Sequence, residues 1–317
     1  MTSQQPPATD TMDTATTGTR TLAKGVWGVL ATPFHRPDLA VDLRSLQAEV
    51  QFYHRIGAAG VVALGVFGEA TSLSVAEQVA VIATVAEAGD GLPVVAGLSS
   101  RSTAPLVELA SRLREAGGGA LVAVMAQVNS PNPDTVRRHF DALYRGCGLP
   151  VVVQDYPVAS GVTIRPDVLA AVVAECPYVA AVKCEAPPTA VAISILAESV
   201  PVPLFGGLGG AGLIDELAAG AAGAMTGFSY PEGLIAAVQA FQADGFAAAR
   251  DAFSPWLPIA NFENQPGIGL AIRKETLRRR GLIAEAAVRP PAPGFPAVLA
   301  PLLDNHLRTL PVPADAR

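Results

Sequence analysis

Short apolar runs rich in β-branched residues recur eight times along this chain, and a helical stretch follows each of them. The runs span residues 26–30, 60–64, 93–97, 120–125, 150–154, 178–183, 202–206 and 223–227. Their spacing of roughly 20 to 35 residues is the length of a βα unit. Strands that are apolar along their whole length are typical of parallel sheets covered on both faces. Eight such units in series predict an α/β fold, a (β/α)8 TIM barrel, rather than a doubly wound sheet.

Local signals at the ends of the predicted helices agree with this fold. Ser74 and Glu77 form a capping box that opens the helix after the second strand. Pro105, Pro133 and Pro166 each stand where a helix is expected to begin. Glycines at positions 117–119, 146 and 148 are placed to end helices before the fourth and fifth strands.

The barrel is predicted to have a flanking segment at each end. Residues 1–22 are rich in Thr, Gln, Ala and Pro, which predicts a disordered N-terminal extension outside the fold. The barrel itself is expected over residues 23–230. The strand pattern then stops, and residues 231–317 are predicted to form a C-terminal helical appendage of about three helices packed on the barrel.

Composition and charge exclude several classes of partner. The net charge of −6 is spread along the chain, so we expect no nucleic-acid binding. Gly, Pro and charged residues interrupt every apolar run before about 18 residues, so we expect no membrane span. The basic cluster at 273–274 and 278–280 is interpreted as a solvated helix face. The cysteine spacing offers neither a disulfide framework nor a zinc pattern and favours the cytoplasm. The isolated histidines predict no histidine metal site.

Lys183 closes the sixth run, at the point where an apolar strand meets a polar loop. In a TIM barrel the active site lies at the carboxyl ends of the strands, so this amine is expected at the functional mouth. Burial lowers the pKa of a lysine by up to about 3–5 units and frees the amine to attack a carbonyl. Lys183 is therefore the candidate Schiff-base nucleophile. The structural alternative is a lysine that extends to the surface from a strand end.

Further candidates lie at the ends of the neighbouring strands. Tyr156 and Glu185 are acid/base candidates, because a phenol or a carboxyl near the bound carbon can move protons during cleavage or dehydration. Packing of the tyrosine and pairing of the glutamate with an arginine are the structural alternatives. Gly65 and Gly68 flank a turn whose N–H groups can face a carboxylate, unless glycine serves only the turn's conformation. Gly206 opens a glycine-rich loop without phosphate-loop spacing, where a ligand can approach closely.

These residues resemble a known family. Gly65-Val66-Phe67-Gly68-Glu69 followed by Thr71-Ser72-Leu73-Ser74 is similar to the GTTGE…LS signature of the dihydrodipicolinate synthase / N-acetylneuraminate lyase family. The lysine strand, the glycine-rich seventh loop and the tail with Arg289-Pro290-Pro291 are also similar. The family comprises class I lyases on TIM barrels, usually tetrameric, that bind pyruvate or another 2-oxo acid as an imine. The resemblance implies that Lys183 forms the imine, that the backbone at Val66 and Phe67 holds the substrate carboxylate, and that Met225 lines the pyruvate pocket.

Several positions depart from the family pattern. Gln154 stands where members usually carry a tyrosine, Val66 and Phe67 replace two proton-carrying threonines, and Ala159 replaces the arginine that binds the synthase's second substrate. Gln154 cannot act as an acid or base near neutral pH, although it can hydrogen-bond an imine or a hydroxyl. Tyr156 does not simply replace the missing tyrosine, because two residues along a strand move a side chain by about 6.5–7 Å. Glu185 or a substrate carboxylate is expected to supply the proton step.

Three hypotheses fit this combination. We expect a carbon–carbon or carbon–oxygen lyase, an aldolase or dehydratase, that binds pyruvate or a 2-keto-3-deoxy acid as an imine. Because the imine is itself the electron sink, we expect no metal and no organic cofactor. The alternatives are 4-hydroxy-tetrahydrodipicolinate synthase, which condenses pyruvate with aspartate semialdehyde, and a catalytically silent barrel that binds a 2-oxo acid. By resemblance, a homo-oligomer is expected, either a tetramer or a dimer.

Overall fold

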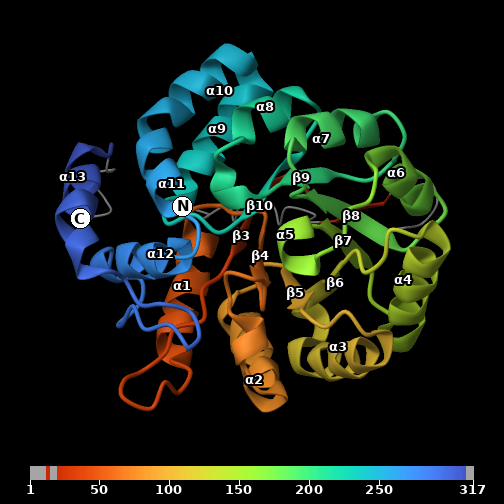
Figure 1. The fold of residues 1–317 in the computed structure, drawn as a ribbon, viewed down its shortest axis with the longest axis horizontal. Coiled ribbons are helices and arrows are strands. Elements are labelled where there is room, and N and C mark those ends of the chain that lie inside the picture. The colour runs from red at the N-terminus through yellow and green to blue at the C-terminus, as the bar shows by residue number, and fades with distance from the viewer. Residues whose placement is uncertain (1–11, 15–19, 312–317) are drawn as a thin grey trace, which may run out of the picture.

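The structure, a computed structural model, describes residues 12–14 and 20–311. All eight predicted strands are present, and they close into a parallel barrel in which β10 pairs with β3 (Figure 1). The strands are β3 (Gly25–Val29), β4 (Gly60–Ala63), β5 (Val94–Leu98), β6 (Leu121–Gln127), β7 (Val151–Asp155), β8 (Val179–Cys184), β9 (Leu204–Gly206) and β10 (Gly223–Thr226). The prediction of a TIM barrel is confirmed.

Helices surround the barrel in a ring (Figure 1). They are α1 (Leu43–Arg55), α2 (Val75–Ala88), α3 (Thr103–Gly117), α4 (Pro133–Cys147), α6 (Pro166–Ala174), α7 (Thr189–Ala197), α8 (Leu213–Ala218) and α9 (Pro231–Asp244), with the short α5 (Pro157–Ser160) after β7. Single 3-10 turns are η1 (Ala70–Ser72), η2 (Gly118–Ala120), η3 (Leu208–Gly210), η4 (Ser254–Trp256) and η5 (Ala297–Leu299). The predicted capping box at Ser74 is present, and Gly148 ends α4 in the left-handed conformation.

Alternation along each strand divides the apolar core into two layers. Val152, Ala181, Phe205 and Met225 belong to one cluster inside the barrel. The residues between them, such as Val182, pack outward against the helices in a second cluster. Side chains two residues apart on a strand share one face. A residue at the carboxyl end of a strand therefore faces the mouth if the residue two positions before it faces the inside of the barrel, and otherwise it faces the helices.

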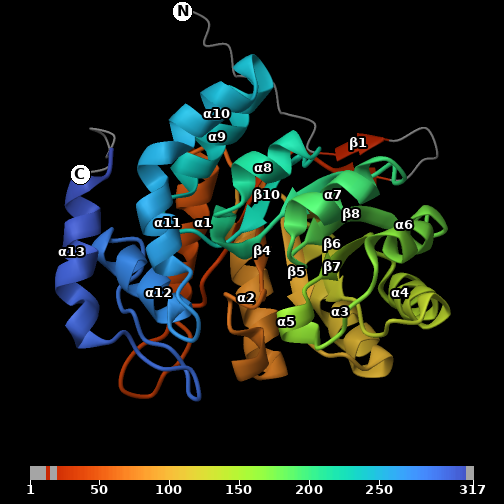
Figure 2. The same cartoon turned by 45° about the horizontal axis from the view of Figure 1, so that its top comes forward.

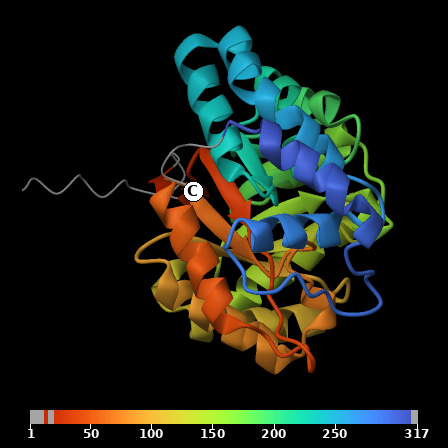
Figure 3. The same ribbon diagram turned by 90° about the vertical axis from the view of Figure 1, so that its left-hand side faces the viewer.

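The C-terminal part adds α10 (Phe246–Phe253), α11 (Leu257–Glu263), α12 (Gly269–Arg279) and α13 (Ala300–Thr309). Figure 3 shows these helices stacked along one side of the barrel. Phe228, Tyr230, Phe253 and Trp256 form the aromatic centre of the cluster that joins them to α9. The described residues therefore hold more helices after residue 230 than the sequence pattern predicted.

The N-terminal segment is described only in part. Residues 1–11 and 15–19 of the predicted disordered extension lie outside the described residues. Within it, β1 (Met12–Thr14) pairs antiparallel with β2 (Arg20–Leu22), and Figure 2 shows β1 beside the barrel near α7. Leu22 is buried and belongs to the cluster inside the barrel.

The basic cluster on α12 differs from its prediction. Lys274 is fully buried and the side chain of Arg273 is only 14 % exposed, whereas Arg278 is 43 % exposed. The interpretation as a solvated helix face is therefore wrong for the first two residues, because α12 packs with this side toward the barrel. No helix among the described residues is long and apolar enough to cross a membrane.

Candidate active site

Lys183 points into the barrel at its carboxyl end. It follows the inward-facing Ala181 by two residues on β8, so its side chain shares that inner face. Gln154 on β7 stands in the same relation to Val152 and pairs in register with Lys183. Only 5 % of Lys183 and 4 % of Gln154 is exposed. The structure thus places the predicted nucleophile and the residue in the tyrosine position side by side.

Glu185 joins these two side chains. Its Oε2 accepts a hydrogen bond of 2.6 Å from Gln154 Nε2 and lies 3.3 Å from Lys183 Nζ. Its Oε1 accepts a 3.4 Å hydrogen bond from the backbone N–H of Leu208. A Cβ at Gly207 would lie 2.3 Å from Oε1, so only glycine there leaves room for the carboxylate. Glu185 is therefore paired with Gln154 and Lys183 rather than with an arginine, and a carboxylate stands in reach of the amine.

Two further buried carboxyl groups, those of Asp155 and Glu216, lie near Cys184, and neither was singled out from the sequence. Burial and the nearby charge of Glu185 raise the pKa of Asp155 to about 6. Burial raises the pKa of Glu216 to about 7, although Thr189 Oγ1 donates a 2.7 Å hydrogen bond to Oε1. A Cβ at Gly206 would lie 1.7 Å from Glu216 Oε2. The space beside Gly206 is thus filled by this carboxyl, where the sequence predicted a ligand contact.

Tyr156 is half-buried at the start of α5. Within the described residues its hydroxyl makes no hydrogen bond, so it remains available as a donor. Burial and the charge of Glu185 raise its pKa, which keeps the phenol protonated at neutral pH. Cys184, next to the nucleophile, is fully buried in the outer layer, and burial raises its pKa. It is therefore an inert core thiol.

The turn after β4 presents backbone donors. Val66 is 53 % exposed and Phe67 is half-buried. In the described part of the chain, the N–H groups of Val66, Phe67 and Gly68 donate no hydrogen bond. Consecutive free amides at a turn bind anions well, and a substrate carboxylate is one such anion. The geometry fits the role predicted for this turn.

A buried ion pair fixes this turn. Glu69, at φ 52°, ends it in the left-handed conformation. Its carboxylate contacts Lys274 Nζ and also accepts a 2.9 Å hydrogen bond from Arg289 N. Lys274 Nζ donates to Thr32 O at 2.7 Å and to Ala287 O at 2.8 Å. All three ammonium protons therefore have acceptors, so Lys274 is a structural lysine.

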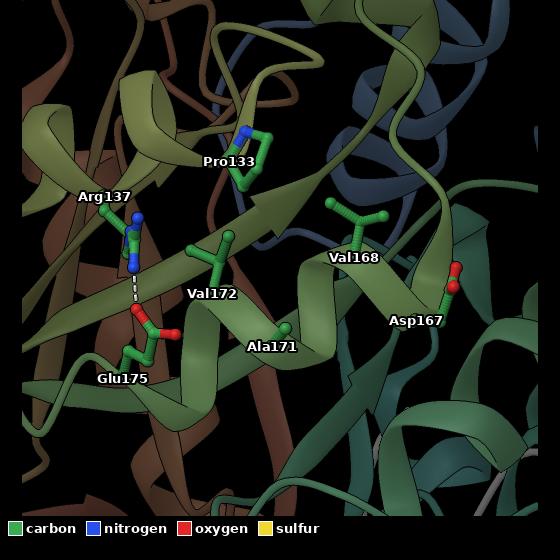
Figure 4. Close-up of a pocket in the computed structure, with 7 residues that line it drawn as sticks. All are labelled: Pro133, Arg137, Asp167, Val168, Ala171, Val172 and Glu175. Atoms are coloured by element: carbon green, nitrogen blue, oxygen red, sulfur yellow. Dashed lines mark ion pairs between the residues drawn. The ribbon is translucent and has the colours of Figure 1, made fainter.

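Met225 faces the inside of the barrel near the carboxyl end of β10. It is fully buried in the cluster inside the barrel and pairs in register with Trp27. Figure 4 shows a hollow in a different place, outside the barrel between α4 and α6. It is lined by Pro133, Arg137, Asp167, Val168, Ala171, Val172 and Glu175. Arg137 and Glu175 form an ion pair there, and none of the predicted site residues takes part.

A buried lysine on the inner face of a TIM barrel, 3.3 Å from a carboxylate, is placed where an amine can lose its proton and attack a carbonyl. The family model described as Dihydrodipicolinate synthetase family matches residues 22–295, and the chain belongs to this family. The resemblance drawn from the motifs is confirmed.

Similar proteins carry the name of the synthase. The 4-hydroxy-tetrahydrodipicolinate synthase of Haloarcula marismortui is 34 % identical over 146 residues, which are 46 % of this chain and 47 % of that protein. That of Methanocaldococcus jannaschii is 29 % identical over 206 residues, 62 % of this chain and 70 % of that protein. The match thus spans about half the length of the first relative. The structure of dihydrodipicolinate synthase from Rhodopseudomonas palustris has a TM-score of 0.84 at 30 % identity, covering 91 % of this chain and 98 % of that one.

Proposed function

We propose that this protein is a Schiff-base-forming lyase, an aldolase or dehydratase, that acts on pyruvate or a 2-keto-3-deoxy acid. The observation that carries the proposal is the inward-facing amine of Lys183 with the Glu185 carboxylate 3.3 Å away. Nucleophile and proton acceptor within reach of each other, inside a largely dry site, are what imine formation needs.

Imine formation begins when Lys183 gives a proton to Glu185 and attacks the C2 carbonyl. The free amides of the turn at Val66 and Phe67 hold the neighbouring carboxylate. The alkoxide takes a proton from the attacking nitrogen, Glu185 returns its own proton to the resulting hydroxyl, and water leaves as the protonated imine forms. Because the protonated imine accepts an electron pair, either C3–C4 cleavage or loss of a C3 proton followed by the C4 hydroxyl becomes feasible.

We assign the roles of the missing tyrosine to two residues, Gln154 and Tyr156. Gln154 does not titrate, so its part is to hold Glu185 in place through the 2.6 Å hydrogen bond. Tyr156, a protonated phenol with a free hydroxyl, is the candidate proton donor to the C4 hydroxyl as it departs in dehydration. In cleavage the C4 hydroxyl gives up its proton to the Glu185 carboxylate or to a substrate carboxylate as the aldehyde forms. Glu185 is thus the residue that moves protons at the nitrogen, and Tyr156 the one that serves the C4 hydroxyl in dehydration.

Turnover of a panel of 2-keto-3-deoxy acids, followed by product mass spectrometry, tests the proposal. We expect one member to yield either pyruvate and an aldehyde or a dehydrated product, and Lys183→Arg to abolish the reaction. Arginine keeps the positive charge but cannot form the imine, so it separates chemistry from charge. Full activity in Lys183→Arg would refute the proposal. Imine formation without turnover across the panel would favour the silent 2-oxo-acid-binding barrel.

The named relatives support one alternative, condensation of pyruvate with aspartate semialdehyde. The position of the arginine that binds the second substrate is Ala159, an exposed residue on α5. A coupled assay with that pair of substrates tests the alternative, and absence of turnover removes it.

We further propose a cytoplasmic homo-oligomer, a tetramer or a dimer. The three cysteines are free and buried, which suits a reducing compartment. Light scattering on the purified protein measures the oligomeric state directly.

A further inference from the structure

Arg273 is a buried cation that the mechanism above does not use. It lies on α12 with its side chain 14 % exposed. Its guanidinium carbon is 5.4 Å from the centre of the Phe67 ring, in the turn expected to hold the substrate carboxylate. A Cβ at Gly209 would lie 2.6 Å from Arg273 Nη2. The guanidinium therefore sits between the β4 turn and the β9 loop, two of the loops that bound the mouth.

Hydrogen bonds connect Arg273 with the catalytic carboxylate. Arg273 Nη2 donates to Asn264 Oδ1 at 2.6 Å, and Asn264 Nδ2 donates to Leu208 O at 3.0 Å. The N–H of the same Leu208 donates to Glu185. The positive charge of Arg273 also lowers the pKa of Tyr156, against the larger effect of burial. The charge of Arg273 therefore acts on groups at the mouth of the barrel.

Most donors of this guanidinium are unused. Arginine has five N–H donors, and in the described part of the chain Arg273 makes a single side-chain hydrogen bond, to Asn264. Its Nε is buried without a hydrogen-bond partner, and the nearest acidic oxygen, Glu263 Oε2, is 3.7 Å away. Burial raises the pKa of Glu263 and the charge of Arg273 lowers it, so the two groups form a loose ion pair without a hydrogen bond. A buried guanidinium with unused N–H donors can bind an anion through them.

We propose that Arg273 binds a carboxylate at the end of the substrate remote from the imine carbon, which makes the substrate a dicarboxylic 2-oxo acid. This inference rests on the proposed function. The first carboxylate already has the free amides at Val66 and Phe67, and Arg273 lies against the Phe67 side chain beyond them. Because Ala159 leaves α5 without a cation for the remote carboxylate of the substrate, Arg273 on α12 supplies the positive charge. A single guanidinium beside the carboxylates of Glu185 and Glu263 suits a monoanionic carboxylate better than a phosphate dianion.

Matched substrates test the assignment. The wild type, Arg273→Ala and Arg273→Lys are assayed on three 2-keto-3-deoxy acids of equal chain length that end in a carboxylate, a hydroxymethyl group or a phosphate ester. Arg278→Ala is the control, because it removes a charge from the exposed side of the same helix. Trapping of pyruvate with borohydride on each variant reports imine formation separately, since pyruvate has no remote anion.

The wild type is expected to prefer the dicarboxylate by about 10- to 100-fold in kcat/KM, the range for one charged hydrogen-bonded contact. Arg273→Ala should abolish that preference while pyruvate trapping stays normal, Arg273→Lys should keep part of it, and Arg278→Ala all of it. Three results overturn the inference: an unchanged preference in Arg273→Ala, a wild-type preference for the hydroxymethyl or phosphate end, or loss of pyruvate trapping in Arg273→Ala, which assigns Arg273 to the first carboxylate. Absence of trapping in the wild type overturns the proposed function itself.

Discussion

Replacing Glu185 by glutamine removes the proton acceptor at Lys183 and one half of a buried ion pair. Glutamine keeps an oxygen at the Oε2 position, so the bond from Gln154 survives. The 3.4 Å hydrogen bond from Leu208 N and the negative charge 3.3 Å from Lys183 Nζ are lost. One such bond contributes about 0.5–1.5 kcal/mol to the free energy of unfolding. Removing one partner of a buried ion pair costs about a further 3–5 kcal/mol, so the melting temperature should fall, and the rate is measured below the unfolding transition.

The effect on rate is measured on the folded variant and is therefore separate from the effect on stability. A positioned acid or base contributes about 10²–10⁴-fold to rate, which corresponds to about 3–5 kcal/mol of barrier. In single-turnover experiments with pyruvate and borohydride, Glu185→Gln should form the trapped adduct at least about 100-fold more slowly than the wild type. Glu216→Gln is the control, because it makes the same change in a buried carboxyl bonded to Thr189 instead of Lys183. An adduct formed by Glu185→Gln at a rate within a few-fold of the wild type would refute the reasoning.

The remaining predictions concern stability. Glu49 is fully buried and its pKa is raised from 4.5 to about 8 by burial, so the folded state holds a proton that the unfolded state releases between these values. Glu49 alone should lower the unfolding free energy by up to about 5 kcal/mol as the pH rises through this window. Glu49→Gln should remove this share of the fall and leave the share that comes from Asp155 and Glu216; a pH dependence in Glu49→Gln equal to that of the wild type, measured in denaturant curves at pH 5 and pH 8.5, would contradict this. Lys274→Met leaves Glu69 buried without its cation and should cost about 3–5 kcal/mol in the same denaturant assay, against no loss if the pair is dispensable. Gly206→Ala drives a Cβ into Glu216 and should cost about 1–3 kcal/mol; a melting temperature equal to that of the wild type would show that the carboxyl simply moves.

The sequence predicts the barrel well because parallel strands buried on both faces leave continuous apolar runs, and eight of them admit few arrangements. It also locates Lys183, since a charged residue that ends such a run must lie at the mouth. The inward direction follows from parity with Ala181, which the structure places inside the barrel. The sequence also identifies Glu185 as a candidate, because it follows Lys183 by two residues.

The opposite side of the site was not predictable from the pattern. Arg273 and Lys274 stand in a run of charges that reads as a solvent-facing helix, and only tertiary packing shows that α12 turns them inward. Lys274 is neutralised by Glu69, 205 residues away in the chain, so no local signal marks the pair. Glu216 is a similar case, because its burial depends on the missing side chain of Gly206 on a neighbouring element.

Mass mapping of the protein after incubation with pyruvate and borohydride tests the central claim most directly. The chain has three lysines, which makes the outcome easy to assign. The account predicts a reduced pyruvyl adduct on the peptide that contains Lys183, none on those with Lys24 or Lys274, and none at all in Lys183→Arg. An adduct on either of the other two lysines, or no adduct at saturating pyruvate, would contradict it.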